Sequence, residues 1–301
     1  MSASKGSDLM QFIVPLQNKE NIQALRDAGA KGIIIQNDDI TPRPVKSYTK
    51  EDMEEIVSLC KQFAMDVYLH LNIMMHQTHV KTVKDYLSFA KTHQIDGIIF
   101  GDIGVYQLAK ELGIHDKLIF QPGTLTTNAY DANFWHKNNI KGMFVAREIT
   151  TDEVLEIAKN SPINTAMIGH GYLNMFHSKR PLITNFLTYQ KERRPELFNN
   201  YEMTLIEEKR QDKFPIFENT HGTHVFRAKP MHSFHVILAL KETIDLFMID
   251  SIFQSDNYTI NVLKDYQTII KAPSKQDAVI KKYQATHDTG FLDKSTVYDT
   301  F

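Results

Sequence analysis

The sequence predicts an α/β protein that folds as a TIM-like (β/α)8 barrel, with a β-hairpin inserted between the seventh and eighth strands. Three observations predict this fold. Short β-branched runs alternate with longer stretches of helical period. Most runs are continuously apolar, as expected of parallel strands covered on both faces. Eight such runs occur in one chain of 301 residues, which suits a closed barrel; a doubly wound open sheet is the main alternative.

The predicted elements follow one another in a regular order. The strands cover residues 12–16, 32–36, 67–72, 97–101, 117–121, 142–146, 165–169 and, much later, 246–250. Amphipathic helices lie between them; in the first clear example, one face at helical spacing carries Met53, Ile56, Val57, Cys60, Phe63 and Ala64. Segments 82–93 and 151–160 follow the same pattern, and Thr151 or Asp152 can cap the second.

One barrel domain is predicted over residues 1–272, followed by a C-terminal helix and a mobile polar tail over 273–301. The barrel pattern breaks at 201–228, which alternates in hydrophobicity around a polar middle and contains Gly222. This segment is predicted to form the hairpin of an insertion at about 201–230. Residues 257–272 then form the helix that packs the barrel closed.

The composition is that of a globular protein, with 42% hydrophobic and 23% charged residues. The formal net charge of −2 gives no overall field that attracts a polyanion, so a nucleic-acid contact needs a local basic patch. The beginning of the sequence, MSASKGSDLMQFIV, lacks the apolar stretch of a signal peptide, and no run is long enough to span a bilayer. We therefore expect a cytoplasmic protein that does not contact the membrane.

Polar residues gather where the predicted strands end, which is the face that carries the active site in (β/α)8 barrels. They are Gln36, Asn37, His70, Asn72, Asp102, Gln121, Thr124, Asn128, Arg147, Glu148, His170 and Asp250. Among them, Asn72, Asp102, Gln121 and Asn128 are predicted to bind the substrate. For each residue taken singly, a solvated or helix-capping role is the alternative.

Three of these residues are the catalytic candidates. Arg147 and Glu148 directly follow a strand, and the guanidinium can bind an anionic ligand; the alternative is a salt bridge that anchors the loop. His170 can act as an acid, a base or a hydrogen-bond donor near neutral pH, or it can simply orient the next loop.

A basic stretch lies between residues 177 and 194, where HSKR and KERR are interleaved with Phe176, Phe186 and Tyr189. Lys179 and Arg180 are predicted to contact a nucleic-acid backbone while the aromatic rings stack on bases, the alternative being a solvated charged face.

Metal-ligand and nucleophile candidates are few. Two i, i+3 histidine pairs, His221/His224 and His232/His235, could supply zinc ligands but lack a recognised zinc motif. The single cysteine, Cys60, excludes an internal disulfide and a cysteine-held metal site, and its place on a buried helix face indicates a packing role.

The stretch IGHGYLNMFHSKRPLITNF, residues 168–186, resembles the signature of peptidase family U32, His-Gly-Ala-Leu-Cys followed by Ser-Gly-Arg-Cys and Leu-Leu-Ser. His170, Gly171, Leu173, Ser178 and Arg180 match it, whereas Asn174 and Pro181 stand at two cysteine positions. Segments 121–135, 145–150, 213–229 and 249–267 resemble further parts of the family pattern in the same order. The resemblance covers roughly residues 10–272.

This resemblance implies a TIM-like barrel and an activity other than proteolysis. Family members studied as enzymes look like oxygen-independent hydroxylases of RNA bases or quinone precursors, with a [4Fe–4S] cluster on four cysteines. In Firmicute-type bacteria, two adjacent paralogues are implicated in forming 5-hydroxyuridine at the tRNA wobble position, with prephenate implicated in the pathway. Since Asn174 and Pro181 cannot supply thiolates, we expect this chain to hold no cluster or other cofactor of its own.

The first hypothesis for function is therefore a tRNA-modification component that works with a cluster-bearing U32 paralogue. The mouth of its barrel would bind an anionic small molecule, such as prephenate, or the substrate nucleotide. A peptidase or other hydrolase is the second hypothesis, although no Ser-His-Asp, Cys-His or zinc pattern is found. A non-catalytic scaffold protein is the third.

Overall fold

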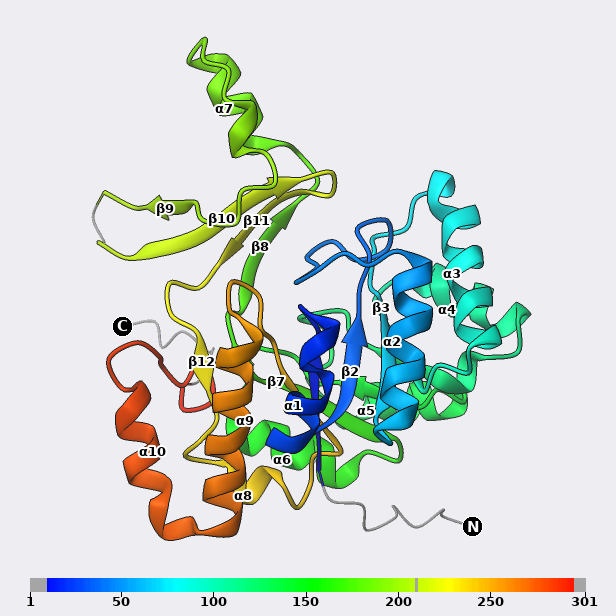
Figure 1. The fold of residues 1–301 in the computed structure, drawn as a ribbon, viewed down its shortest axis with the longest axis vertical. Helices are drawn as coiled ribbons and strands as arrows, with labels where there is room; N and C mark the ends of the chain where they lie inside the picture. The colour runs from blue at the N-terminus through cyan, green and yellow to red at the C-terminus, as the bar shows by residue number, and fades with distance from the viewer. Residues whose placement is uncertain (1–9, 209–210, 295–301) are drawn as a thin grey trace.

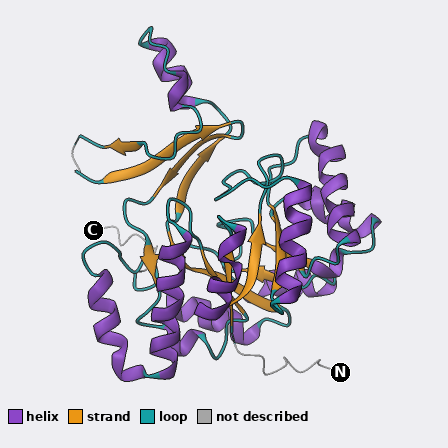
Figure 2. Cartoon of the chain, in the orientation of Figure 1, coloured by secondary structure: helices purple, strands orange, loops and turns teal. Residues whose placement is uncertain are grey.

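The computed structural model describes residues 10–208 and 211–294, and it contains a closed barrel of parallel strands (Figures 1 and 2). The barrel strands are β1 (Gln11–Pro15), β2 (Ala30–Ile35), β3 (Asp66–Leu71), β4 (Gly97–Phe100), β5 (Leu118–Phe120), β6 (Gly142–Phe144), β7 (Asn164–Gly171) and β13 (Leu246–Ile249). Each strand pairs with the next, and β13 pairs with both β7 and β1. The ring is closed, so the TIM-like barrel is confirmed and the open sheet is excluded.

Helices surround the strands (Figure 2). Those of the barrel are α1 (Ile22–Ala28), α2 (Lys50–Gln62), α3 (Val80–Thr92), α4 (Ile103–Glu111), α5 (Ala129–Lys137), α6 (Thr151–Asn160), α8 (Ile237–Leu240) and α9 (Asp256–Lys271). The cap of α6 differs from the prediction. Thr150 occupies this position in a reciprocal capping box with Glu153, whose carboxylate accepts the Thr150 N–H at 2.7 Å.

The barrel contains two apolar layers. Side chains from all eight strands fill the interior: Ile13, Ile34, Tyr68, Ile99, Ile119, Phe144, Ala166, Leu246 and Met248. Tyr68 is the largest, and a Cβ at Gly32 or Gly97 on the neighbouring strands would lie within 2.6 Å of its ring. The other face of the strands packs against the helices in a larger core, which includes Cys60. The interior is thus solid below the mouth, and an open site can only lie at the strand ends.

The insertion between β7 and β13 is larger than the predicted 201–230. It starts directly after β7 and forms an antiparallel sheet of β8 (Asn174–Ser178), β9 (Thr204–Ile206), β10 (Lys213–Asn219) and β11 (Gly222–Phe226). The predicted hairpin corresponds to β10 and β11, while residues 209–210 lie outside the described residues. The chain returns through β12 (Met231–His232), which pairs with the end of β7. The insertion sheet stands above the barrel mouth (Figure 1).

A helix, α7 (Leu182–Tyr189), projects from the far side of this sheet and buries none of its own residues (Figure 1). Its first turn is held by Glu218, which is 1% exposed. The carboxylate accepts the N–H groups of Ile183 at 2.8 Å and Thr184 at 3.2 Å and the hydroxyl of Thr223 at 3.1 Å. An anion at a helix N-terminus satisfies otherwise unpaired donors and the helix dipole.

The C-terminal segment is packed on the barrel over the part that the structure describes. Helix α10 (Gln276–Tyr283) lies in the segment for which the sequence predicts a short helix. Beyond it, Asp288 pairs with Arg227 at 2.6 Å, and the Leu292 carbonyl accepts the Thr151 N–H at 2.9 Å. This part of the predicted mobile tail is therefore tied down, and residues 295–301 lie outside the described residues. Among the described helices, none has the length and apolar character needed to cross a membrane.

Candidate functional site

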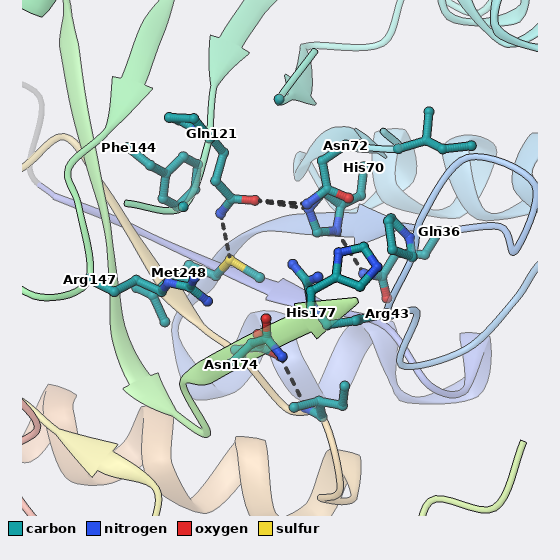
Figure 3. A pocket seen from close by; sticks show the side chains of 18 of the residues that line it. Gln36, Arg43, His70, Asn72, Gln121, Phe144, Arg147, Asn174, His177 and Met248 are labelled. Carbon is teal, nitrogen blue, oxygen red and sulfur yellow. Dashed lines mark hydrogen bonds between the residues drawn. The ribbon is translucent and has the colours of Figure 1, made fainter. Parts of the chain in front are cut away.

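A cavity of about 260 Å³ opens at the carboxyl ends of the barrel strands, beneath the insertion (Figure 3). Of the strand-end residues predicted from the sequence, those that line it are Gln36, His70, Asn72, Asp102, Gln121, Arg147 and Asp250. The insertion contributes Tyr172, Asn174, His177 and Phe226, and the loop after β2 contributes Pro42 and Arg43. The prediction that polar strand ends converge at one mouth holds for these residues.

One wall of the cavity is an oriented hydrogen-bond chain. The Val45 N–H donates to Gln36 Oε1 at 2.8 Å, which directs Gln36 Nε2 toward His70 Nδ1, also at 2.8 Å. His70 Nε2–H then donates to Gln121 Oε1 at 3.0 Å. Burial lowers the pKa of His70 to about 4, so the ring is neutral and can accept at one nitrogen while donating at the other. The Gln121 amide nitrogen is left as a donor near Met248.

Two guanidinium groups, those of Arg43 and Arg147, share this cavity (Figure 3). Burial, and next the charge of Arg147, lower the pKa of Arg43 to about 10, while Asp250 opposes the shift. Burial also lowers the pKa of Arg147 against the charges of Glu148 and Asp250. Among the described residues neither side chain donates a hydrogen bond or forms an ion pair, and Arg147 Nε is buried without a partner.

The carboxyl group of Asp250 acts electrostatically on both arginines, but its single charge does not fully balance their two positive charges. Burial raises the pKa of Asp250, although the Ile252 N–H at 3.1 Å and the two arginines favour its charged form. Asp102, the other acidic residue in the wall, already accepts the N–H groups of Gly104 at 2.8 Å and Met75 at 3.0 Å. Two partly buried cations that have no hydrogen-bond or ion-pair partner among the described residues can bind a negatively charged ligand.

The structure places the catalytic candidate His170 outside this cavity, on the helix-facing side of β7. Its Nδ1 lies 3.2 Å from the Tyr266 hydroxyl and its Nε2 lies 2.7 Å from the Tyr258 hydroxyl. Ile168 lines the cavity, so strict alternation would direct His170 inward as well. A bulge in the β7–β13 register at Gly169 reverses this direction. His170 and Arg147 therefore do not share a pocket.

Six further predicted residues do not line the cavity, and Asn37 and Thr124 are two of them. Asn128 caps α5, because its Oδ1 accepts the N–H groups of Tyr130 at 3.0 Å and Asp131 at 3.3 Å. Glu148 is exposed beside Arg147 without an ion pair to it among the described residues. Lys179 and Arg180 are exposed on the insertion, between β8 and α7.

Sequence reasoning missed Arg43 and His177. Arg43 lies in a loop between two prolines rather than at a strand end, so the strand-end rule does not select it. His177 lines the cavity from β8 and stacks on His224 with ring centroids 4.3 Å apart. The histidine pairs do not converge on a metal site: the described part of the chain has no group of three or more His, Cys, Asp or Glu residues that could hold one.

The residues at the two cysteine positions of the family signature do not fit an iron–sulfur cluster. Asn174 donates to the carbonyls of Phe176 at 3.0 Å and Val225 at 3.1 Å, which ties β8 to β11. Pro181 precedes the first turn of α7. The one cysteine, Cys60, is buried on α2, where burial raises the pKa of its thiol to about 12. Neither signature position offers a thiolate, and Cys60 is not at the mouth.

A closed parallel barrel with a polar cavity at its carboxyl mouth, lined by two arginines and two aspartates, defines a TIM-like α/β barrel protein with a ligand site in the usual place. The chain belongs to peptidase family U32, whose sequence model matches residues 17–295. It is 29% identical to tRNA hydroxylation protein P2 of Bacillus subtilis over 96% of this chain and 99% of that protein.

Two further comparisons add one more relative and one solved structure of similar fold. An uncharacterised protease of Methanocaldococcus jannaschii is 24% identical over 94% of this chain and 73% of that protein. The solved structure of a U32 peptidase superposes with a TM-score of 0.51 at 13% identity, covering 82% of this chain and 94% of the other. This structural likeness concerns the fold alone.

Proposed function

We propose that this protein contributes to tRNA hydroxylation, in the formation of 5-hydroxyuridine at the wobble position, together with a cluster-bearing U32 paralogue in the cytoplasm. The likeness to tRNA hydroxylation protein P2, which extends over almost the full length of both chains, supports this proposal. The observation that carries it is the cavity in which Arg43 and Arg147 lie without direct anionic partners.

In this proposal the cavity holds an anionic small molecule, for which prephenate, a dicarboxylate, is the candidate. Two guanidiniums match two carboxylates, since each can donate paired hydrogen bonds to one of them. The Gln121 amide nitrogen, oriented through His70, adds a neutral donor. Arg147 keeps its proposed role in the site, whereas His170 and Glu148 have none there.

The tRNA is proposed to contact the outer side of the insertion. Basic residues flank α7 at both ends: Lys179 and Arg180 before it, and Lys191, Arg193 and Arg194 after it, where Arg194 pairs with Glu192 at 2.8 Å. Phe186 and Tyr189 on α7 are 61% and 82% exposed, so their rings are free to stack on bases. The redox chemistry is assigned to the paralogue, since this chain lacks the thiolates of the family cluster.

Peptide hydrolysis is the alternative that the name of the protease relative raises. Among the described residues that line the cavity there is no serine, threonine or cysteine to act as a nucleophile. This observation favours the tRNA proposal over a hydrolase that forms a covalent acyl-enzyme.

Mass spectrometry of tRNA nucleosides tests the proposal. Cells lacking the gene should lose 5-hydroxyuridine and its derivatives, and the wild-type gene should restore them. Arg147→Ala should fail to restore them, whereas Glu148→Ala, which alters the exposed neighbour, should succeed. An unchanged nucleoside profile in the deletion strain would contradict the role in tRNA hydroxylation. Rescue by Arg147→Ala would show that the Arg147 cavity is not needed for this role.

A further inference from the structure

Arg43 is held in an unusually stiff segment, Thr41-Pro42-Arg43-Pro44. Each proline fixes its own φ, and a residue that precedes a proline is restricted to extended conformations. The backbone from which the Arg43 guanidinium extends is therefore placed by the docking of the whole segment. Its position depends on the contacts that anchor the segment more than on local flexibility.

Two anchors come from the barrel. The Thr41 hydroxyl donates to the carbonyl of His70 at the end of β3. On the other side of the segment, the Val45 N–H donates to Gln36 Oε1 at 2.8 Å. Both contacts lie at the ends of the segment, and neither holds the Pro42 carbonyl that immediately precedes Arg43.

The third anchor comes from the insertion, from a residue that is distant in sequence. Asn219, at the end of β10, donates its Nδ2 to the Pro42 carbonyl at 3.0 Å. The His221 N–H donates to Asn219 Oδ1 at 2.9 Å, which fixes the amide with its nitrogen toward Pro42. Asn219 is 6% exposed, so this bond is shielded from water and has no ready substitute.

Neighbouring residues at the end of the β10–β11 hairpin form hydrogen bonds with different parts of the structure. Glu218 holds the first turn of α7, as described above, while Asn219 holds the Pro42 carbonyl. The His221 ring makes no hydrogen bond to a described residue of the cavity. Its Nε2 instead contacts the carbonyl of Asp38, in the same loop as Arg43. Asn219 is thus the insertion residue that bonds directly to the backbone beside Arg43.

We propose that Asn219 is a positioning residue for anion binding: the insertion sets the place of the Arg43 guanidinium in the barrel cavity through the Asn219–Pro42 hydrogen bond. The inference rests on the anion site of the proposed function. It adds that this site is completed by the insertion rather than by the barrel loops alone. Asn219 itself does not line the cavity and acts only through Arg43.

The test measures prephenate binding by isothermal titration calorimetry with the full-length protein. Asn219→Ala should weaken binding roughly tenfold or more, because a small displacement of a positioned group is enough for such a loss. In an Arg43→Ala background the same substitution should have almost no further effect. In an Arg147→Ala background it should still weaken binding, because Arg43 remains there to be displaced.

Asn200→Ala is the matched control. Asn200 also lies in the insertion and accepts a local hydrogen bond from the Glu202 N–H at 2.8 Å, and among the described residues it has no hydrogen bond to the Arg43 loop. It should leave prephenate affinity unchanged. Circular dichroism and thermal unfolding of each variant separate misfolding from displacement of Arg43.

The outcomes separate this inference from the proposed function. If Arg43→Ala and Arg147→Ala weaken binding but Asn219→Ala does not, the positioning role is wrong and the anion site stands. Equal losses from Asn219→Ala with and without Arg43 would show a general structural effect and overturn the inference too. If the wild type does not bind prephenate, the proposed ligand fails, and the inference fails with it.

Discussion

His170 Nε2 and the Tyr258 hydroxyl lie 2.7 Å apart behind β7, and the same hydroxyl lies 2.6 Å from His287 Nε2 in the C-terminal segment. This bridge joins a barrel strand, α9 and the segment after α10. His170, one of the three catalytic candidates, therefore takes part in a buried link between these elements.

His170→Leu should destabilise the protein and leave the cavity intact. The substitution leaves the Tyr258 hydroxyl with one partner fewer in a buried site, which costs about 1–3 kcal/mol. Urea unfolding measures the loss, and prephenate titration should show wild-type affinity. A variant of unchanged stability that no longer binds the ligand would contradict this assignment.

Acid should destabilise the fold through its buried histidines. Burial lowers the pKa values of His70, His232 and His287 to about 4, whereas the unfolded chain binds protons near pH 6.5. Between these values the unfolded state carries more protons, so stability falls as pH drops below 6.5, by up to about 1.4 kcal/mol per pH unit for each histidine. Urea unfolding from pH 7.5 to 5 measures the slope, and His232→Phe should reduce it. A slope that His232→Phe leaves unchanged would contradict the prediction.

Glu218→Gln should loosen α7 without unfolding the barrel. The helix buries none of its residues, and the carboxylate receives its first N–H groups. A neutral amide keeps the shape but loses the charge-assisted bonds, worth about 1.5–3 kcal/mol each. Hydrogen exchange should quicken over residues 182–189 and stay as in the wild type in the barrel strands. Equal acceleration in both regions would show that the effect is global.

The double variant Lys179→Ala, Arg180→Ala should weaken tRNA binding and flatten its salt dependence. If each side chain contacts one phosphate, the slope of log affinity against log salt falls by roughly 1 for each contact removed. Filter binding at several salt concentrations measures this slope. Lys264→Ala, an exposed lysine on α9, is the control. An unaltered slope in the double variant would place the RNA elsewhere.

Much of the fold could be predicted from the sequence because buried parallel strands leave continuous apolar runs. Segments such as 97–101 and 142–146 are covered on both faces, so burial requires a continuous apolar run rather than an alternating one. The start of the insertion left no comparable signal. In β8, Met175 and Phe176 are adjacent exposed apolar residues, so the strand shows no regular alternation.

The candidate site was predicted in part for the same physical reason. Asn72 and Gln121 directly follow strands, and topology alone brings them to the mouth. His170 also lies at a strand end, but the direction of its side chain depends on one bulge that no local pattern shows. The segment that carries Arg43 is tied to the insertion by the hydrogen bond from Asn219 to the Pro42 carbonyl, and no local sequence pattern shows a contact between residues so distant in sequence.

The two connections of the insertion lie side by side. The chain leaves the barrel after Gly171 and returns at Met231, and these two residues are direct partners in the β7–β12 pairing. A short turn could therefore replace everything between them without changing the register of the barrel strands. The insertion is in this sense a separable unit of the fold, but the cavity is not independent of it, because Tyr172, Asn174, His177 and Phe226 would leave the cavity wall together with it.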